Sequence, residues 1–256
     1  MFDELRGRVV LVTGGASGIG AGIVDAFLGE GSTVVSADLS APEGGLLAGR
    51  DREWVLRLDV SDEAAVEAAV TAIDERFGPV DIVVTAAGTS TLGFAVETSG
   101  GDWDRNLDVN AKGSFLVAKH VAKRLVSAGR TGRIVFIASQ AGKNGYRGMT
   151  AYVASKHAVL GVTKTMAVEL AGHGITVNAI CPGIIETPMK HRERIEGGAI
   201  RGMTAEEVAD EDRSQVPLGR TGTPQDVAGV ALFLASDLSS YMTGQGLNVT
   251  GGMTMH

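Results

Sequence analysis

Tyr152 and Lys156 form a pair of side chains whose spacing could support acid–base chemistry. They occupy positions i and i+4, so a helix would place both on one face. An ammonium group near a phenol favours the phenolate and lowers the tyrosine pKa from about 10, which suits proton transfer at neutral pH. Taken alone, the spacing is more typical of a solvated surface pair, because such pairs are common.

Two further polar residues fall at positions where a site could form. Ser139 comes just after the apolar run 134–138, and the carboxyl edge of a parallel sheet is where ligands bind. Its hydroxyl could hold a carbonyl or hydroxyl oxygen of a substrate. Asn110 is a polar residue inside a helical pattern, where a satisfied buried amide or a local kink is the alternative interpretation.

The segment 13–20, Thr-Gly-Gly-Ala-Ser-Gly-Ile-Gly, has the spacing of a phosphate-binding turn. It follows an apolar run at 9–12 and opens a helical pattern over 18–30, the context that a dinucleotide-binding motif requires. Gly14 would allow the tight turn, Gly18 the approach of a pyrophosphate, and Gly20 close packing of the helix on the sheet. The helix N-terminus would supply free N–H groups for the phosphates, whereas the alternative is an ordinary glycine-rich loop.

Two aspartates follow strand-like runs beyond this turn. Asp38 lies 18 positions after Gly20, where its carboxylate could accept from both ribose hydroxyls and would repel a 2′-phosphate. Residues 14–20 and 38–40 contain no lysine or arginine, which favours NAD over NADP. Asp59 could accept from the adenine amino group or simply cap the turn before the next helix. The small residues 86–88, Ala-Ala-Gly, would let the adenosine lie flat over the sheet ends.

These residues need a framework of alternating strands and helices. Strands are expected at 9–12, 33–37, 54–58, 80–85, 134–138, 176–180 and 247–249, and helices at 18–30, 62–77, 103–127, 151–171 and 224–235. The strands are continuous apolar runs, which indicates burial on both faces. The sequence therefore predicts an α/β fold, a single-domain doubly wound parallel sheet (Rossmann-type) over 1–256 with helices on both faces. The charged stretch 184–216 is expected to be an irregular substrate lid.

Composition sets the broad class. Glycine fills 36 of 256 positions, roughly twice the average usage, while 44% apolar content excludes disorder. The net charge of −7 argues against nucleic-acid and anionic membrane partners. We also expect no membrane span, no secretory signal and, since Cys181 is the one cysteine and an inert buried thiol, a cytoplasmic protein. His120 and His157 lack companions at metal spacing, so no metal site is expected.

With these motifs in place, nearly the whole chain resembles the short-chain dehydrogenase/reductase family. The matching positions are 13–20, Asp59-Val60, Ala86-Ala87-Gly88, Asn110, Ser139, Tyr152 to Lys156, and Pro182-Gly183 with Thr187. The resemblance implies that Tyr152 is the acid/base and that Ser139 orients the substrate. It also implies that Lys156 binds the nicotinamide ribose and tunes Tyr152, and that Asn110 holds a water in the proton relay. Thr85 departs from the asparagine that the family often has there, which puts local rigidity in doubt.

The resemblance also implies two sets of binding residues and a homotetramer assembled through the long helices. The cofactor contacts would be Gly14, Ser17, Gly18, Ile19, Gly20, Asp38, Leu39, Asp59, Val60, Ala86, Ala87, Gly88, Tyr152, Lys156, Pro182, Gly183, Ile185 and Thr187. The substrate contacts would be Ser139, Gln140, Asn144, Tyr146, Met149, Tyr152, Ile184 and Met189.

The tail 241–253 and the segment 139–142 resemble those of NAD-dependent polyol and diol dehydrogenases, such as sorbitol- or butanediol-type enzymes. The expected reaction is reversible oxidation of a secondary alcohol, in which Tyr152 as phenolate takes the hydroxyl proton while a hydride passes to the cofactor. The alternatives are an NADPH-dependent 3-oxoacyl-thioester reductase and a non-catalytic NAD-responsive binding protein. The basic cluster in 189–194 could meet a phosphorylated or acidic substrate, although a solvated helix face balanced by Glu193 and Glu196 is the favoured interpretation.

Overall fold

The computed structural model describes residues 2–256, so only Met1 of the expected domain lies outside it. Its strands are β1 (Val9–Thr13), β2 (Thr33–Asp38), β3 (Leu47–Ala48), β4 (Glu53–Arg57), β5 (Ile82–Thr85), β6 (Gly132–Ile137), β7 (Ile175–Pro182) and β8 (Gly246–Val249). They form one sheet in the order β3-β4-β2-β1-β5-β6-β7-β8. Neighbours pair in parallel except β3, which is antiparallel to β4.

The central strands owe their position to their apolar sequences. Every residue of β1 and of β5 is buried, as expected for parallel strands covered by helices on both faces. The chain runs outward from β1 to β2 and then returns to place β5 on the other side of β1. The connections therefore leave β1 and β5 in opposite directions, which opens a crevice at their carboxyl ends.

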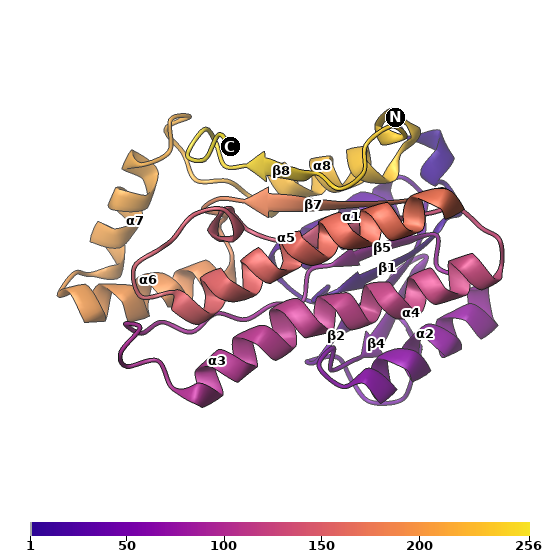
Figure 1. The fold of residues 1–256 in the computed structure, drawn as a ribbon, viewed down its shortest axis with the longest axis horizontal. Coiled ribbons are helices and arrows are strands. Elements are labelled where there is room, and N and C mark those ends of the chain that lie inside the picture. The colour runs from indigo at the N-terminus through magenta and orange to yellow at the C-terminus, as the bar shows by residue number, and fades with distance from the viewer. Residues whose placement is uncertain (1) are drawn as a thin grey trace.

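The helices form a layer on each face of this sheet (Figure 1). Their bounds are α1 (Gly18–Gly29), α2 (Glu63–Phe77), α3 (Gly100–Asn106), α4 (Ser114–Ser127), α5 (Thr150–Leu170), α6 (Pro188–Arg201), α7 (Ala205–Ser214) and α8 (Pro224–Ala235). Helices α1 and α8 pack together on one face over a core around Phe27 and Val34. Helices α2, α4 and α5 cover the other face over a core around Phe136 and Leu116. The predicted doubly wound fold is confirmed.

One predicted long helix contains a change of helix type. The pattern over 103–127 becomes a continuous rod of α3, a π-helical segment η2 (Leu107–Gly113) and α4. The rod begins one turn earlier than expected, because Ser99 accepts the backbone N–H of Asp102 and caps α3. Asn110 lies within the π-helical segment, and such segments occur often at functional sites.

The expectation of an irregular stretch over 184–216 is wrong, because most of it forms α6 and α7. Thr187 caps α6 with Pro188 at its first position, Gly202 ends it at φ +68°, and Thr204 with Glu207 forms a capping box for α7. The helical period was hidden because the buried positions of α6 are Arg194 and Gly198 rather than an apolar stripe. Strand β3 was also missed, since two residues carry no detectable period.

The α6–α7 segment extends beyond the end of the sheet toward which the β7 and β8 arrows point, so it lies at the carboxyl ends of these strands (Figure 1). Within residues 2–256, no helix combines the length and the apolar character that crossing a membrane would need.

Candidate active site

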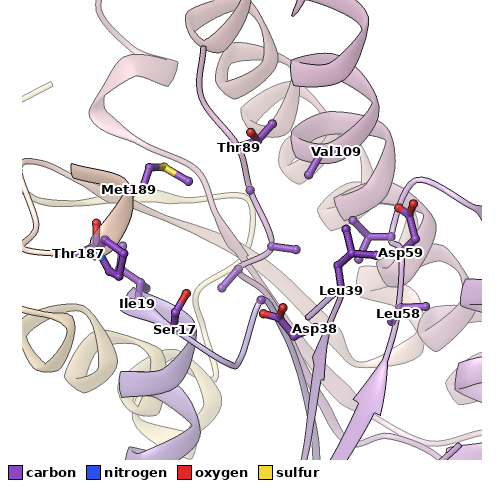
Figure 2. Close-up of a pocket in the computed structure, with 18 of the residues that line it drawn as sticks. Ser17, Ile19, Asp38, Leu39, Leu58, Asp59, Thr89, Val109, Thr187 and Met189 are labelled. Carbon is purple, nitrogen blue, oxygen red and sulfur yellow. The ribbon is translucent and has the colours of Figure 1, made fainter. Parts of the chain in front are cut away.

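A groove of about 520 Å³ lies over the carboxyl ends of the strands around β1, and we name it the cofactor groove. In Figure 2, Ile19, Thr187 and Met189 flank one side of it and Leu39, Leu58 and Asp59 the other, with Ser17 and Asp38 between them. It is lined by Gly14, Ser17, Gly18, Ile19, Gly20, Asp38, Leu39, Leu58, Asp59, Val60, Ser61, Ala86, Ala87, Gly88, Thr89, Arg105, Val109, Thr187, Pro188 and Met189.

The glycine turn at the start of α1 is shaped for close backbone approach. Gly14 has φ +69°, and a Cβ there would lie 2.7 Å from the backbone of Ala87. A Cβ on Gly20 would collide with the carbonyl oxygen of Gly14, so Gly20 packs the helix onto the turn rather than onto the sheet as expected. Ser17 makes no side-chain cap, which leaves the first N–H groups of α1 free for an anion. The turn therefore fits the pyrophosphate of a dinucleotide.

Asp38 stands at the end of β2 with its carboxylate fixed in place. Its Oδ2 accepts from the Ala16 N–H at 3.2 Å, and its Oδ1 accepts from the Ser40 N–H and hydroxyl at 2.9 and 2.7 Å. These bonds hold a carboxylate on the groove beside Leu39. Arg105, on α3, is a cationic residue on the same groove that sequence analysis did not identify.

For Asp59, the structure shows the turn-capping role. Its Oδ1 accepts from the Ser61 hydroxyl at 2.7 Å and the Ser61 N–H at 2.9 Å, and these bonds hold the pKa of Asp59 below its usual range. Helix α2 itself is capped by Asp62, which accepts from the N–H groups of Ala64 and Ala65. Asp59 still lines the cofactor groove, so the expected adenine contact stays a prediction.

Ser139, Tyr152 and Lys156 converge in a pocket of about 110 Å³, the catalytic pocket. The Lys156 Nζ lies 5.7 Å from the centre of the Tyr152 ring. The residues shared with the cofactor groove make the two spaces contiguous, and they are Ile19, Ala86, Gly88, Thr89, Thr187 and Met189. The predicted nicotinamide-end residues Pro182, Gly183 and Ile185 line the catalytic pocket as well.

Burial dominates the electrostatics of this pocket. It raises the pKa of the Tyr152 phenol, the charge of Glu193 raises it further, and a hydrogen bond with Ser139 acts in the opposite direction. Burial also lowers the pKa of Lys156 to about 8. The pKa of Tyr152 is therefore raised rather than lowered as expected, and the Lys156 Nζ donates to the backbone carbonyl of Ile137.

Asn110 connects the loop after β5 to helix α5. Its Oδ1 accepts from the Thr89 N–H at 2.8 Å, and its Nδ2 donates to the Thr89 carbonyl and the Ser155 hydroxyl, both at 2.9 Å. Ser155 in turn donates to the carbonyl of Tyr152 at 2.7 Å. The fully buried amide is thus satisfied by protein groups, and its expected role in holding a water stays a prediction.

A third space of about 160 Å³, the substrate pocket, opens beside Ser139 and Tyr152. The predicted substrate contacts Gln140, Tyr146, Met149 and Ile184 line it, together with Ala141, Gly183, Lys190, Glu193, Asp212, Gln215 and Met253. Met189 lies instead on the cofactor groove and the catalytic pocket. Asn144 lines none of these three spaces and donates to the Thr254 hydroxyl at 3.0 Å.

Asp212 and Gln215 were not predicted, because their segment was expected to be irregular. Lys190 and Glu193 were considered only as part of the basic cluster and as its balancing charge. The Thr187-Pro188 start was the available signal, since Lys190 and Glu193 are three residues apart on the helix that it begins.

The basic cluster is a solvated face only in part. His191 and Arg192 are exposed, and Arg192 pairs with Glu196 at 3.5 Å as expected, whereas Lys190 and Arg194 belong to an ion-pair network within the protein. Arg194 is buried, makes two bonds to Glu186 at 2.8 and 2.7 Å, and donates to Asp212 at 2.8 Å. The guanidinium of Arg194 holds the pKa of Glu186 down at about 2. Lys190 pairs with Asp212 at 3.2 Å, and Arg192 donates to the carbonyl and hydroxyl oxygens of Ser90. These bonds anchor α6 to α7 and to the loop after β5.

Within the described residues, no group of histidine, cysteine, aspartate and glutamate side chains has the geometry of a metal site. Cys181 is a buried free thiol whose pKa is raised by burial.

Comparisons with known proteins agree with this geometry. The family described as enoyl-(acyl carrier protein) reductase matches residues 14–254. The chain is 39% identical to 3-oxoacyl-(acyl-carrier-protein) reductase FabG of Thermotoga maritima, over 98% of this chain and 100% of that one. It is 39% identical to D-threitol dehydrogenase of Mycolicibacterium smegmatis, over 99% and 96% of the two chains. The structure of sorbitol-6-phosphate 2-dehydrogenase SrlD from Erwinia amylovora superimposes with a TM-score of 0.91, at 36% identity over 97% and 100%.

The fold and the site thus define an oxidoreductase that acts on alcohol or carbonyl groups with a nicotinamide cofactor. The chain belongs to the short-chain dehydrogenase/reductase family.

Proposed function

We propose that the protein is an NAD-dependent dehydrogenase that interconverts a secondary alcohol and a ketone in a polyol, diol or related small molecule. The observation that carries the proposal is the convergence of Ser139, Tyr152 and Lys156 in a pocket contiguous with the cofactor groove. The same three residues have no evident use in a protein that only senses NAD, so the binding-protein alternative is not favoured.

The residues of the catalytic pocket divide the work of alcohol oxidation. Ser139 holds the substrate oxygen, and the Tyr152 phenolate accepts its hydroxyl proton. A nicotinamide cofactor held in the cofactor groove would supply the acceptor for the hydride on the carbon that bears this hydroxyl. In the reverse reaction, the Tyr152 phenol returns its proton to the developing alkoxide. The Lys156 ammonium beside the ring would stabilise the phenolate form.

Asp38 supports NAD as the cofactor. A carboxylate fixed by Ala16 and Ser40 at the end of β2 can accept from ribose hydroxyls, and it repels the 2′-phosphate of NADP. Initial rates with NAD and NADP at equal concentration test this choice. Faster turnover with NADP would overturn it.

The size and polarity of the substrate pocket support a small hydroxylated substrate. Its volume is about 160 Å³, and Gln140, Lys190, Glu193, Asp212 and Gln215 supply polar groups to its wall. The second candidate is an NADPH-dependent 3-oxoacyl-thioester reductase, which the similarity to FabG favours and Asp38 opposes. A panel of polyols, diols, hydroxysteroids and sugars is assayed for NADH production, and a 3-oxoacyl thioester is assayed for NADPH consumption, to identify the substrate. Activity confined to thioesters would favour the reductase.

We also propose that the protein forms a homotetramer and that it is located in the cytoplasm. Trp103 on α3, Phe115 on α4 and Val168 on α5 are exposed apolar side chains on the long helices, as a contact with another copy would need. Light scattering after size-exclusion chromatography tests the oligomeric state, and a monomer would contradict it.

A further inference from the structure

The charged residues of α6 and α7 are divided between the ion-pair network and the site. Lys190, Glu193 and Asp212 line the substrate pocket. Lys190 is neutralised by Asp212 at 3.2 Å, and Asp212 also accepts from the buried Arg194 at 2.8 Å. Arg194 is shared in turn with Glu186, so its charge is already opposed. The positive charges of Lys190 and Arg194 are therefore compensated by carboxylates of the protein itself.

Glu193, like Lys190, lines both the catalytic and the substrate pocket, but unlike Lys190 it has no ion pair among residues 2–256. Its Oε1 accepts from the Ser90 hydroxyl at 2.6 Å. Ser90 is buried and held by Arg192, which donates to the Ser90 carbonyl at 3.0 Å and to its hydroxyl at 3.1 Å. Ser90 thus holds the Glu193 carboxylate through its Oε1 atom. The Oε2 atom accepts no hydrogen bond from any residue that the structure describes.

The charge balance around the substrate pocket is negative. The charged residues on its wall are one cation, Lys190, and two carboxylates, Glu193 and Asp212. Of the other nearby cations, Lys156 lines only the adjoining catalytic pocket, and Arg192 binds Ser90 and Glu196. The charge of Glu193 raises the pKa of Tyr152, so a charged group bound beside that phenol would also interact electrostatically with Glu193.

We propose that Glu193 selects the substrate: its carboxylate accepts a hydrogen bond from a hydroxyl of an uncharged polyhydroxyl compound, and it repels compounds with a phosphate or carboxylate near the reacting carbon. This inference rests on the proposed dehydrogenase activity and narrows its substrate class. A free carboxylate oxygen needs a donor when a ligand displaces water, and a substrate hydroxyl provides one. An anion in the substrate pocket meets two carboxylates, and the one cation on the wall of that pocket, Lys190, is already paired with Asp212.

The test uses three variants with matched charge changes. Glu193→Gln keeps an acceptor and removes the charge, Glu193→Leu removes both, and Glu206→Gln removes the same charge from an exposed position on α7. The probes are sorbitol and sorbitol 6-phosphate with NAD, and ethyl acetoacetate and acetoacetate with NADH. The second pair differs in charge but contains no polyol, so it reports on charge selection whether or not polyols are substrates.

The wild-type enzyme and Glu206→Gln should prefer the neutral member of each pair by kcat/KM. Glu193→Gln should reduce this preference by about 10- to 50-fold, as expected for a unit charge several ångströms away at an effective dielectric constant of about 20. Glu193→Leu should also raise the KM for sorbitol, because it removes the hydrogen-bond acceptor. Glu193→Gln keeps an acceptor and should leave this KM nearly unchanged. Where a compound is not turned over, calorimetric Kd values for the cofactor complex give the same comparison.

Two results separate the possible failures. If sorbitol does not react but the acetoacetate pair shows a neutral preference that Glu193→Gln removes, the polyol function fails and charge selection stands. If Glu193→Gln leaves the preference in both pairs unchanged, or the wild-type enzyme prefers the anions, the proposed role of Glu193 is overturned. Thermal unfolding of each variant confirms that it is folded.

Discussion

The Nζ atom of Lys156 donates a hydrogen bond of 2.9 Å to the backbone carbonyl of Ile137, the last residue of β6. This bond fixes one face of α5 against the carboxyl end of a central strand. Tyr152 lies one helical turn before Lys156, and Ser139 lies two residues after Ile137. The bond therefore brings the phenol and the serine hydroxyl to the same pocket, which is the geometry that proton transfer requires.

Replacing Tyr152 with phenylalanine should remove the proton acceptor and leave the pocket shape nearly unchanged. We expect kcat to fall by about 10²- to 10⁴-fold, the usual contribution of a general acid–base group, while NADH still binds. Steady-state rates and NADH fluorescence titration measure the two effects. Tyr241→Phe, at a fully exposed tyrosine, is the control. Near-normal turnover by Tyr152→Phe would contradict the assignment.

Asp38→Asn should reduce the preference for NAD. The amide keeps the size of the side chain but no longer repels a 2′-phosphate, so the ratio of kcat/KM for NAD over NADP should fall by about 10-fold or more. Asp51→Asn makes the same charge change at an exposed position. An unchanged ratio in Asp38→Asn would mean that another part of the groove selects the cofactor.

The pH profile of alcohol oxidation should depend on Glu193. Burial and the Glu193 charge raise the pKa of Tyr152, and oxidation needs the phenolate, so the rate should increase toward alkaline pH. Glu193→Gln removes one cause of the raised pKa, and its profile should move to lower pH. The comparison is between kcat/KM profiles of the wild-type enzyme, Glu193→Gln and Glu206→Gln. A profile that does not move in Glu193→Gln argues against electrostatic coupling.

Arg194→Met should destabilise the α6–α7 segment. It leaves the Glu186 and Asp212 carboxylates without their buried guanidinium, and breaking such an arrangement typically costs about 3–5 kcal/mol. Urea unfolding measures the loss, and limited proteolysis locates it to residues 188–214. Arg201→Met removes a more exposed pair between the same two helices and should cost much less. Equal losses in the two variants would contradict the importance of the buried network.

Asn110→Ala should loosen the loop after β5. The change leaves the Thr89 N–H and carbonyl groups without their side-chain partners, at a cost of about 1–3 kcal/mol for each group that stays buried and unpaired. Thermal unfolding and hydrogen exchange at Thr89 report the effect. Gln245→Ala, at an exposed amide, is the comparison and should change little. Unaltered exchange at Thr89 in Asn110→Ala would show that the contact is not needed.

Local patterns were sufficient to predict the parallel sheet, the glycine turn and the placement of Ser139 at the sheet edge, whereas the joint site of Ser139, Tyr152 and Lys156 was expected from the family resemblance. The first three depend on short-range periodicity or on the common edge where parallel strands end. The place of Glu193 on the walls of two pockets could not be predicted, because the orientation of α6 is set by the buried Arg194 network rather than by an apolar stripe. The raised pKa of Tyr152 was also outside the reach of sequence, since burial is a property of the assembled fold.

The π-helical segment η2 interrupts the α-helical repeat of the rod from α3 to α4, so residues before and after it follow different positions around the helix axis. Each residue of an α-helix turns the chain by about 100°, so a single deletion within Leu107–Gly113 would not merely shorten the rod. It would remove a residue that the wider π-helical turn holds in excess of an α-helical turn, shift the neighbouring residues around the helix axis and carry the Asn110 amide away from Thr89 or from Ser155. The Asn110 contacts therefore depend more on the number of residues in this segment than on which side chains occupy most of its exposed positions.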